Sequence, residues 1–314
     1  MSRVHDALRR AENQGLPLEP EPAAVIIPER PPRDYSHGNG YVNGEGNGNG
    51  NGNGNGNGNG KTPGRAKASS HKNPLDRDML AEVQVVPFQP ALESHLLDLD
   101  NNPETPAEEF RTLRTRLNHL GTLQPLHTII VTSPSPAEGK TFTAVNLALA
   151  ESQLSENLVL LGDFDLRRPI VHNLFQIERS PGLSDFLTGE CTFTQALRKV
   201  EGTNLYLLPA GSTVKNPLEL LNMRQAKQLF EDLPGCFNWA IFDTPPLLFS
   251  ADANLLATLA DGTILVVKIG STTFDNVTRA MQSLCENNVL GIVANGARAS
   301  ELYSKYTYYY SKAD

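Results

Sequence analysis

From about residue 83 onward, short apolar runs alternate with stretches of helical periodicity, and this alternation limits the chain to few folds. Strands are predicted at His127–Ser133, Asn157–Asp163, Asn204–Leu208, Trp239–Asp243, Thr263–Ile269 and Val289–Asn295. Helices are predicted at Lys140–Leu154, Pro217–Leu233, Asp252–Leu259 and Phe274–Asn287. Apolar strands that alternate with helices are typical of a parallel sheet covered on both faces. The sequence therefore predicts an α/β fold with a mostly parallel sheet, whose ligands bind at the carboxyl ends of the strands.

The beginning of the chain has a different composition. Of the 25 glycines, 13 lie in residues 1–64, and residues 47–60 are seven uninterrupted Asn-Gly repeats. Such a segment has no side chains from which to build a core, so we interpret residues 15–81 as a disordered Pro- and Asn-Gly-rich linker. Before it, residues 1–14 are predicted to form a short amphipathic helix, either a fraying end or a docking peptide. Its apolar side chains at helical spacing are Val4, Ala7, Leu8 and Ala11.

Charge and cysteine usage exclude several classes of protein. The net charge is −8, and residues 81–314 hold 17 basic against 26 acidic side chains, so a nucleic-acid partner is not expected. The three cysteines are widely spaced and form no C-x-x-C pair, which suits a reducing cytosol. The longest apolar runs fall far short of the roughly 18 residues of a spanning helix, and the start lacks an apolar signal core. We expect a cytoplasmic protein that reaches the inner face of the membrane through a partner.

A phosphate-binding loop is predicted directly after the first of these strands. Residues 134–141 read PSPAEGKT, which matches G-x-x-x-x-G-K-[ST] except that Pro134 replaces the first glycine. A strand-to-helix loop directs backbone N–H groups and the positive end of the helix at a polyphosphate. Lys140 would neutralise the β- and γ-phosphate oxygens, and the Thr141 hydroxyl would bind Mg²⁺. A lone Gly-Lys-Thr at a capped helix start would be equally plausible, so the interpretation depends on the neighbouring motifs.

Carboxylates follow two further apolar strands. Asp163 and Asp165 come at the end of one strand, and alternate residues of an extended segment face the same way. Asp243 ends another strand. Each aspartate taken singly is more often a cap or turn residue. Three loops of this kind at three strand ends favour one common site.

Together these motifs resemble the bacterial tyrosine kinases associated with capsule and exopolysaccharide export. The resemblance covers roughly residues 82–314 and includes the Lys140 loop, the D-x-D-x-R segment Asp163–Arg167 and the Asp243-Thr-Pro-Pro segment, which correspond to Walker A, Walker A′ and Walker B motifs. It also includes the segments 181–185, 208–211, 216–221 and 290–295. The resemblance implies a P-loop NTPase-type kinase domain over residues 82–298.

The same resemblance implies an activity and a set of site residues. ATP with Mg²⁺ would donate its γ-phosphoryl group to tyrosine hydroxyls, with Asp163 as the base. The implied catalytic residues are Lys140, Asp163 and Asp165; the nucleotide-binding residues are Ala137, Glu138, Gly139, Lys140, Thr141 and Thr143; the magnesium ligands are Thr141, Asp165 and Asp243. Arg167 would either fix the D-x-D segment through a salt bridge or be a surface cation. Asn295 is not among these site residues: from its place at the last strand alone, it would either approach the nucleotide base or form a turn.

Two other features agree with the family. Glu108, Arg111 and Arg114 fall on one face of a helix, where they are either exposed ion pairs or, as in the family, the contact of a homo-oligomer. The flexible tail, residues 299–314, carries five tyrosines that resemble the family's phosphoacceptors or form a sticky docking strand: Tyr303, Tyr306, Tyr308, Tyr309 and Tyr310. Phosphate on the tail would add negative charge and favour disassembly of an acidic ring. The family also implies a transmembrane chain-length regulator as activator and a cognate tyrosine phosphatase.

Departures from the family pattern leave two alternatives. The family usually has glycine where this chain has Ala137, and at a positive φ alanine costs about 1 kcal/mol. An inactive pseudokinase scaffold for polysaccharide assembly is therefore one alternative. The other is an ATPase switch of the MinD/ParA type, which shares the fold and the aspartates. Its signature lysine corresponds to Ser135 here, and such proteins generally lack a tyrosine-rich tail.

Overall fold

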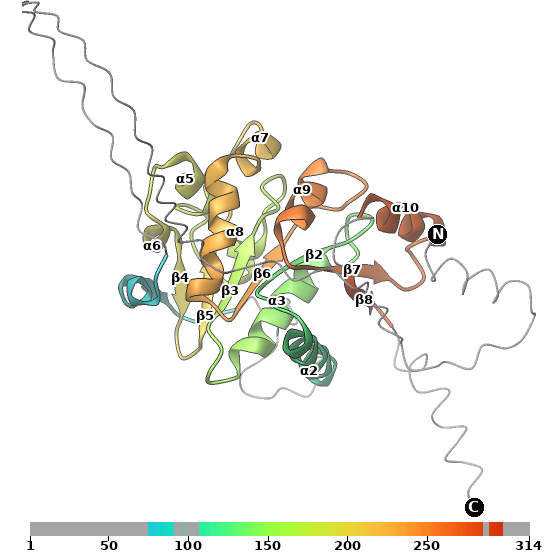
Figure 1. Ribbon diagram of the computed structural model, residues 1–314, viewed down its shortest axis with the longest axis horizontal. Coiled ribbons are helices and arrows are strands. Elements are labelled where there is room, and N and C mark those ends of the chain that lie inside the picture. Colours follow the sequence, from blue (N-terminus) through green and yellow to red (C-terminus); the bar gives the residue numbers. More distant parts are fainter. Residues whose placement is uncertain (1–74, 91–95, 97–106, 285–288, 298–314) are drawn as a thin grey trace, which may run out of the picture. The chain divides into compact units, whose positions relative to one another are not determined.

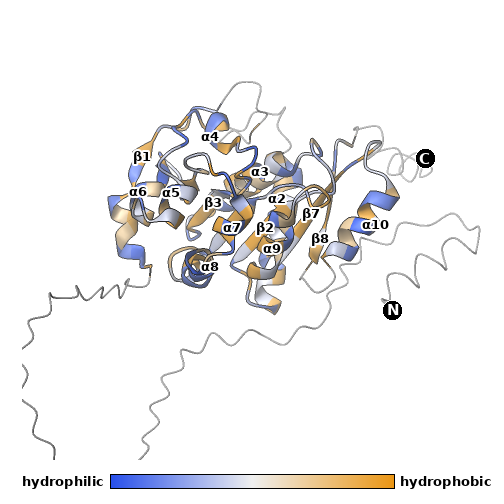
Figure 2. Ribbon diagram, turned by 90° about the horizontal axis from the view of Figure 1, so that it is seen from above, coloured by the Kyte–Doolittle hydropathy of each residue, from blue (hydrophilic) through white to orange (hydrophobic). Residues whose placement is uncertain are grey.

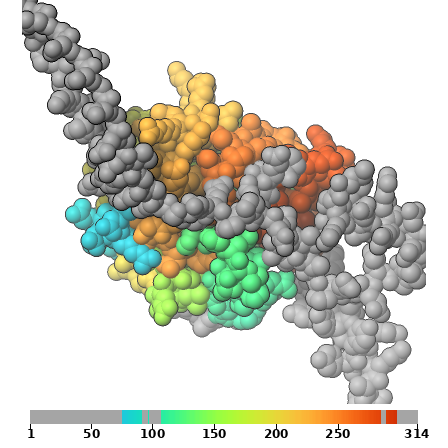
Figure 3. All heavy atoms as spheres, viewed as in Figure 1, coloured from blue at the N-terminus to red at the C-terminus, as the bar shows by residue number. Residues whose placement is uncertain are grey.

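The computed structural model describes residues 75–90, 96, 107–284 and 289–297 (Figure 1). The predicted N-terminal helix 1–14, the linker up to residue 74 and the tyrosine tail 299–314 lie outside the described residues and remain predictions. The described structure starts before the expected boundary at residue 82. The 3-10 helix η1 (Arg77–Glu82) places Leu80 in the core and contacts α6 (Phe193–Ala196), and its segment is cyan in Figure 3.

The described residues form one eight-stranded sheet with the order β1-β4-β5-β3-β6-β2-β7-β8. All neighbouring strands are parallel except β4 and β5, which are antiparallel. All six predicted strands are present, with ends shifted by at most two residues, and the mostly parallel sheet is confirmed. The strands are β1 (Gln84–Val86), β2 (Thr128–Thr132), β3 (Val159–Asp163), β4 (Arg198–Val200), β5 (Leu205–Leu208), β6 (Trp239–Asp243), β7 (Gly262–Lys268) and β8 (Val289–Asn295).

Two separate hydrophobic clusters lie on the two faces of the sheet. On β2, Ile130 belongs to one cluster, whereas Ile129 and Val131 belong to the other, because successive side chains of a strand point to opposite faces. The first cluster contains residues of α8 and α9, and the second contains residues of α2 and α3. Figure 2 shows hydrophobic residues gathered along the central strands. Helices therefore cover both faces, as the sequence predicted.

The helices agree with the prediction in place but not always in extent. The predicted helix Pro217–Leu233 is two helices, because Met223 is extended, with φ −64° and ψ 154°. The second of them continues through Pro234, which lies in its last turn. The remaining bounds are α2 (Ala107–Leu123), α3 (Lys140–Ser152), α4 (Val171–Leu174), α5 (Leu183–Thr188), α7 (Pro217–Leu221), α8 (Arg224–Cys236), α9 (Ala251–Leu259) and α10 (Phe274–Ser283). Within the described ranges, no helix combines the length and apolarity that a bilayer span requires.

The order of the strands brings the predicted motifs together. Strand β6 lies between β3 and β2, and all three are parallel. Asp243 is level with Asp163 on one side and with Val131 on the other. The loop after β2, the segment after β3 and the end of β6 therefore meet at the same carboxyl edge.

Candidate active site

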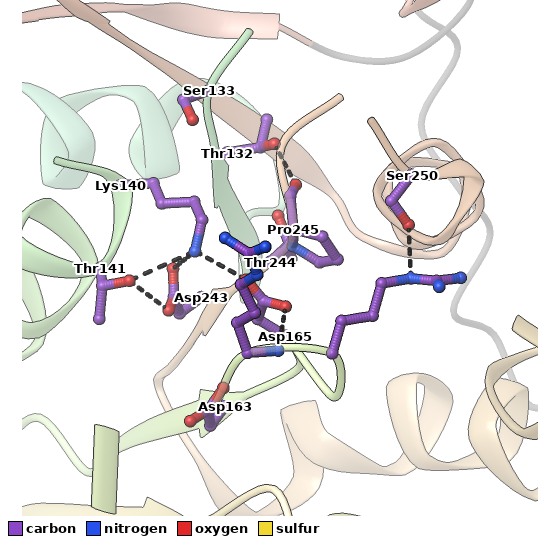
Figure 4. Close-up of polar contacts among 12 residues, drawn as sticks. Thr132, Ser133, Lys140, Thr141, Asp163, Asp165, Asp243, Thr244, Pro245 and Ser250 are labelled. Carbon is purple, nitrogen blue, oxygen red and sulfur yellow. Dashed lines mark hydrogen bonds and ion pairs between the residues drawn. The ribbon is translucent and has the colours of Figure 1, made fainter. Parts of the chain in front are cut away.

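Lys140 is the first residue of α3 and lies between two carboxylates at this edge (Figure 4). Its Nζ atom donates to Oδ2 of Asp165 at 2.9 Å and lies 3.5 Å from Oδ1 of Asp243. Burial by itself lowers the pKa of Lys140, but Asp243 and Asp165 raise it, and the net shift is upward. The lysine is therefore held in its charged form, as a phosphate ligand must be.

Asp243 is fully buried and also contacts the residue after the lysine. The Thr141 hydroxyl donates to Oδ2 of Asp243 at 2.6 Å. Burial raises the pKa of Asp243 to about 6, although Lys140 and the hydrogen bond from Thr141 oppose the shift. A threonine hydroxyl beside a carboxylate is the arrangement that holds Mg²⁺ in P-loop enzymes.

The carboxylate of Asp163 has a different hydrogen-bond partner from that of Asp165, which contacts Lys140. Its Oδ2 atom accepts a hydrogen bond from the backbone N–H of Val171 at 3.1 Å. Its Oδ1 atom is buried and has no hydrogen-bond partner among the described residues. Burial and the charge of Asp243 raise the pKa of Asp163 well above its usual value. A carboxylate with a raised pKa and one free oxygen can accept a proton, which fits the predicted role of base.

The backbone of the loop has the conformation that a phosphate-binding loop needs. Gly139 caps α3 with φ 97°, and no side chain caps the first N–H groups of that helix. These N–H groups and Lys140 together supply the donor set of a triphosphate site. Ala137 has φ 61°, so the position does need a positive φ, and alanine costs about 1 kcal/mol there. The loop nevertheless adopts the conformation.

The other predicted nucleotide-binding residues lie in or next to this loop. The carboxylate of Glu138 is held by protein donors and its backbone carbonyl accepts from Asn295, which leaves the backbone N–H to contact a nucleotide. Thr143 is buried, and its backbone N–H donates to the carbonyl of Gly139 at 2.9 Å. The described residues contain no cluster of three His, Cys, Asp or Glu side chains placed to hold a metal ion by themselves. The predicted set of Thr141, Asp165 and Asp243 includes a hydroxyl, and Mg²⁺ commonly completes its shell with water and phosphate oxygens.

Arg167 makes the salt bridge that was one of its two predicted roles. Its Nε donates to Oδ2 of Asp252 at 2.7 Å, and its Nη2 to Oδ1 at 3.2 Å. Nε also lies 3.2 Å from the hydroxyl of Ser250, the N-cap of α9. The D-x-D segment is thereby tied to α9. Sequence reasoning missed Ser250 and Asp252, because nothing near them in the chain indicates a partner 83 or 85 residues away.

The helix face at Glu108, Arg111 and Arg114 lies on α2. Glu108 and Arg111 form an exposed ion pair. Arg114 instead donates to the backbone carbonyl of Ala150 at 2.7 Å, which is near the end of α3. Part of this face therefore attaches α2 to α3. An oligomer contact through these residues stays a prediction.

Comparison with known proteins agrees with this arrangement. No family model matches the chain. It is 35% identical over 208 residues to the tyrosine-protein kinase YwqD of Bacillus subtilis, covering 66% of this chain and 87% of YwqD. It is 34% identical over 213 residues to the tyrosine-protein kinase Etk of Escherichia coli, of which it spans only 29%.

Solved structures give the same result. The kinase domain of Escherichia coli Etk has a TM-score of 0.59 and 28% identity, and the match covers 70% of this chain and 93% of that one. The chimerical protein CapA2B2 has a TM-score of 0.60 and 26% identity, covering 71% of this chain and 98% of the other. These similarities favour the kinase interpretation over an ATPase switch. Because it is 35% identical to YwqD over 87% of that protein's length, the chain belongs to the family of bacterial tyrosine-protein kinases.

Proposed function

We propose that this chain is an ATP-dependent tyrosine autokinase that phosphorylates the tyrosine cluster at residues 303–310. The observation that carries the proposal is the convergence of Lys140, Thr141 and Asp243 with Asp163 and Asp165 at one edge of the sheet. The five tyrosines of the tail supply acceptor hydroxyls in the same chain. The relatives named as tyrosine-protein kinases support the same reaction.

The residues divide the work of phosphoryl transfer among them. Bound MgATP supplies the γ-phosphoryl group. Lys140 and the backbone N–H groups of residues 137–141 would hold the phosphates, while Thr141, with Asp165 and Asp243 through water, would hold the metal ion. Asp163 accepts the tyrosine proton as the tyrosine oxygen bonds to the γ-phosphorus, the bond to the bridging β–γ oxygen breaks, and ADP leaves. Positioning and charge neutralisation supply most of the catalysis.

Membership of the family supports a proposal for the wider setting of the enzyme. The proposal includes a homo-oligomer formed through α2, in which a neighbouring subunit presents its tail. It also includes a transmembrane chain-length regulator as activator, a cognate tyrosine phosphatase, and a role in capsule or exopolysaccharide synthesis or export. The protein would then work in the cytoplasm at the inner face of the membrane. Repulsion between phosphorylated tails and an acidic body would favour disassembly.

Labelled ATP tests the proposal. The purified full chain is incubated with MgATP, and phosphate is mapped by mass spectrometry, with a variant carrying phenylalanine at positions 303, 306, 308, 309 and 310 as the control. Phosphotyrosine in the tail of the wild type only is the expected result. Release of free phosphate without phosphotyrosine would identify an ATPase switch, and neither product would identify a pseudokinase scaffold.

A further inference from the structure

Thr272, which lies between β7 and α10, reaches the phosphate-binding loop. Its hydroxyl donates to Oε1 of Glu138 at 2.6 Å, across 134 residues of sequence. The same hydroxyl oxygen accepts the backbone N–H of Lys268 at 2.8 Å, which orients its proton toward the glutamate. Glu138 is only 3% exposed. Its position in the loop is therefore fixed from a distant part of the sheet.

A buried glutamate in a phosphate-binding loop needs such a restraint, because its charge has the same sign as the ligand. The second oxygen of Glu138, Oε2, accepts the backbone N–H of Ser135 at 2.8 Å, within the loop itself. Both carboxylate oxygens of Glu138 thus accept hydrogen bonds from within the protein.

The end of β8 restrains the same loop from a second point. The side-chain amide of Asn295 donates to the backbone carbonyl of Glu138 at 3.0 Å. Its oxygen accepts the N–H of Gly296 at 2.9 Å, so both ends of the amide are engaged. Asn295 also packs so closely on Gly139 that a Cβ added to Gly139 would lie 1.9 Å from the amide nitrogen. Asn295 therefore packs on the loop and also bonds within its own turn.

These hydrogen bonds restrain a loop whose backbone conformation is itself unfavourable at Ala137. Ala137, with φ 61°, disfavours the backbone that directs the N–H groups toward the phosphates. Donors that are already in place bind a charged ligand without a further cost of reorganisation. The contacts that hold Glu138, the residue after Ala137, therefore oppose a relaxation of the Ala137 backbone away from its positive φ.

We infer that Thr272 is a positioning residue for MgATP, which acts through Glu138 to keep the phosphate-binding loop in its binding conformation. This inference rests on the proposed nucleotide site. Thr272 is partly exposed, and among the described residues its hydroxyl bonds to Glu138 and Lys268 and not to Lys140, Asp163 or Asp165. Its effect should therefore appear in nucleotide binding rather than in the chemical step.

The test compares Thr272→Val, which keeps the shape but loses the hydroxyl, with Thr272→Ser, which keeps the hydroxyl. Affinity for a fluorescent ADP analogue with Mg²⁺, KM for ATP, kcat for tail phosphorylation and Tm are measured on the full chain. Thr272→Val should weaken nucleotide binding and raise KM by roughly fivefold to twentyfold, with kcat within about twofold, since a hydrogen bond to a charged group is lost. Thr272→Ser should stay within about twofold of the wild type in all of these quantities.

A double-mutant cycle shows whether the effect passes through Glu138. In a Glu138→Ala background, Thr272→Val should add less than about twofold, because its partner is already gone. Unchanged affinity in Thr272→Val, an equal loss in Thr272→Ser, or full additivity in the cycle would each overturn the inference. A wild-type chain that binds no nucleotide would instead reject the proposed function, so the two failures are distinguishable.

Discussion

The Lys140 ammonium group and the Asp165 carboxylate form an ion pair with 2.9 Å between Nζ and Oδ2. The pair joins the start of α3 to the segment after β3, two parts of the chain that are 25 residues apart. Because Asp243 lies on the other side of the same Nζ atom, the lysine is held by carboxylates from two neighbouring strand ends.

Replacing Lys140 with methionine should abolish tyrosine phosphorylation while the protein stays folded. Methionine has a similar length but cannot neutralise the phosphate charge, so transfer should fall by at least about a hundredfold. Phosphotyrosine is measured by mass spectrometry, and folding by circular dichroism and Tm. Unchanged phosphorylation in a folded Lys140→Met protein would count decisively against the site.

Replacing Ala137 with glycine should relieve the cost of the positive φ. We expect the free energy of unfolding to rise by about 0.5–1 kcal/mol and the affinity for MgADP to improve a few-fold. Denaturant unfolding and nucleotide titration measure the two effects. The matched control is Ala251→Gly, an exposed alanine in the first turn of α9, where the same change should leave stability equal or lower. An equal change in the free energy of unfolding in Ala137→Gly and Ala251→Gly would show that the positive φ of Ala137 has no energetic cost.

Removing the Arg167 side chain should loosen the D-x-D segment. Asp252 is buried, with 1% of its side chain exposed, whereas the side chain of Arg167 is 48% exposed, so solvent screens part of the loss. We expect Arg167→Ala to lower the free energy of unfolding by about 1–2 kcal/mol and to reduce phosphorylation. Urea unfolding and the phosphorylation assay measure these changes.

The neighbouring exposed residue provides the control for that experiment. Arg168→Ala should change stability by less than about 0.5 kcal/mol, as is usual for surface positions. In the double variant Arg167→Ala/Asp252→Asn, the loss should be smaller than the sum of the single losses, because the two side chains contact one another. Additive losses would refute a direct coupling between the D-x-D segment and α9.

The buried Glu151, near the end of α3, should make stability depend on pH. Burial raises the pKa of Glu151 from 4.5 to about 7, although Asn118, Arg114 and Asn157 oppose the shift. An acid whose pKa is higher in the folded state stabilises that state below its unfolded pKa, and this stability is lost as pH rises through the folded pKa. We expect this loss between about pH 4.5 and 7.

The comparison with Glu151→Gln isolates this residue from the other titrating groups. Urea unfolding from pH 5 to 8 should show the stability of the wild type falling by about 1–3 kcal/mol relative to Glu151→Gln. Glu156→Gln, at an exposed glutamate five residues further along, should show no such trend. A difference between wild type and Glu151→Gln that is constant across this range would disprove the raised pKa.

Strand positions and the chemistry of the loops could be predicted from the sequence because both are local. An apolar run such as Trp239–Asp243 is buried on both faces wherever it pairs, and its burial pattern agrees. The start of α3 at Lys140 could likewise be predicted, because the signal of the Gly139–Thr141 tripeptide is local. The three-residue strands β1 and β4 were missed, since they are too short to show a period and are ordered by pairing.

Only the tertiary structure decided which distant side chains meet. Arg114 attaches to α3, Arg167 to Asp252 and Thr272 to Glu138, across 36, 85 and 134 residues of sequence. Hydrophobic periodicity determines which face of an element is buried but not which element lies beside it. The sequence alone therefore determined the fold class and indicated the residues of a candidate site, whereas the packing of distant segments decided how those residues are held.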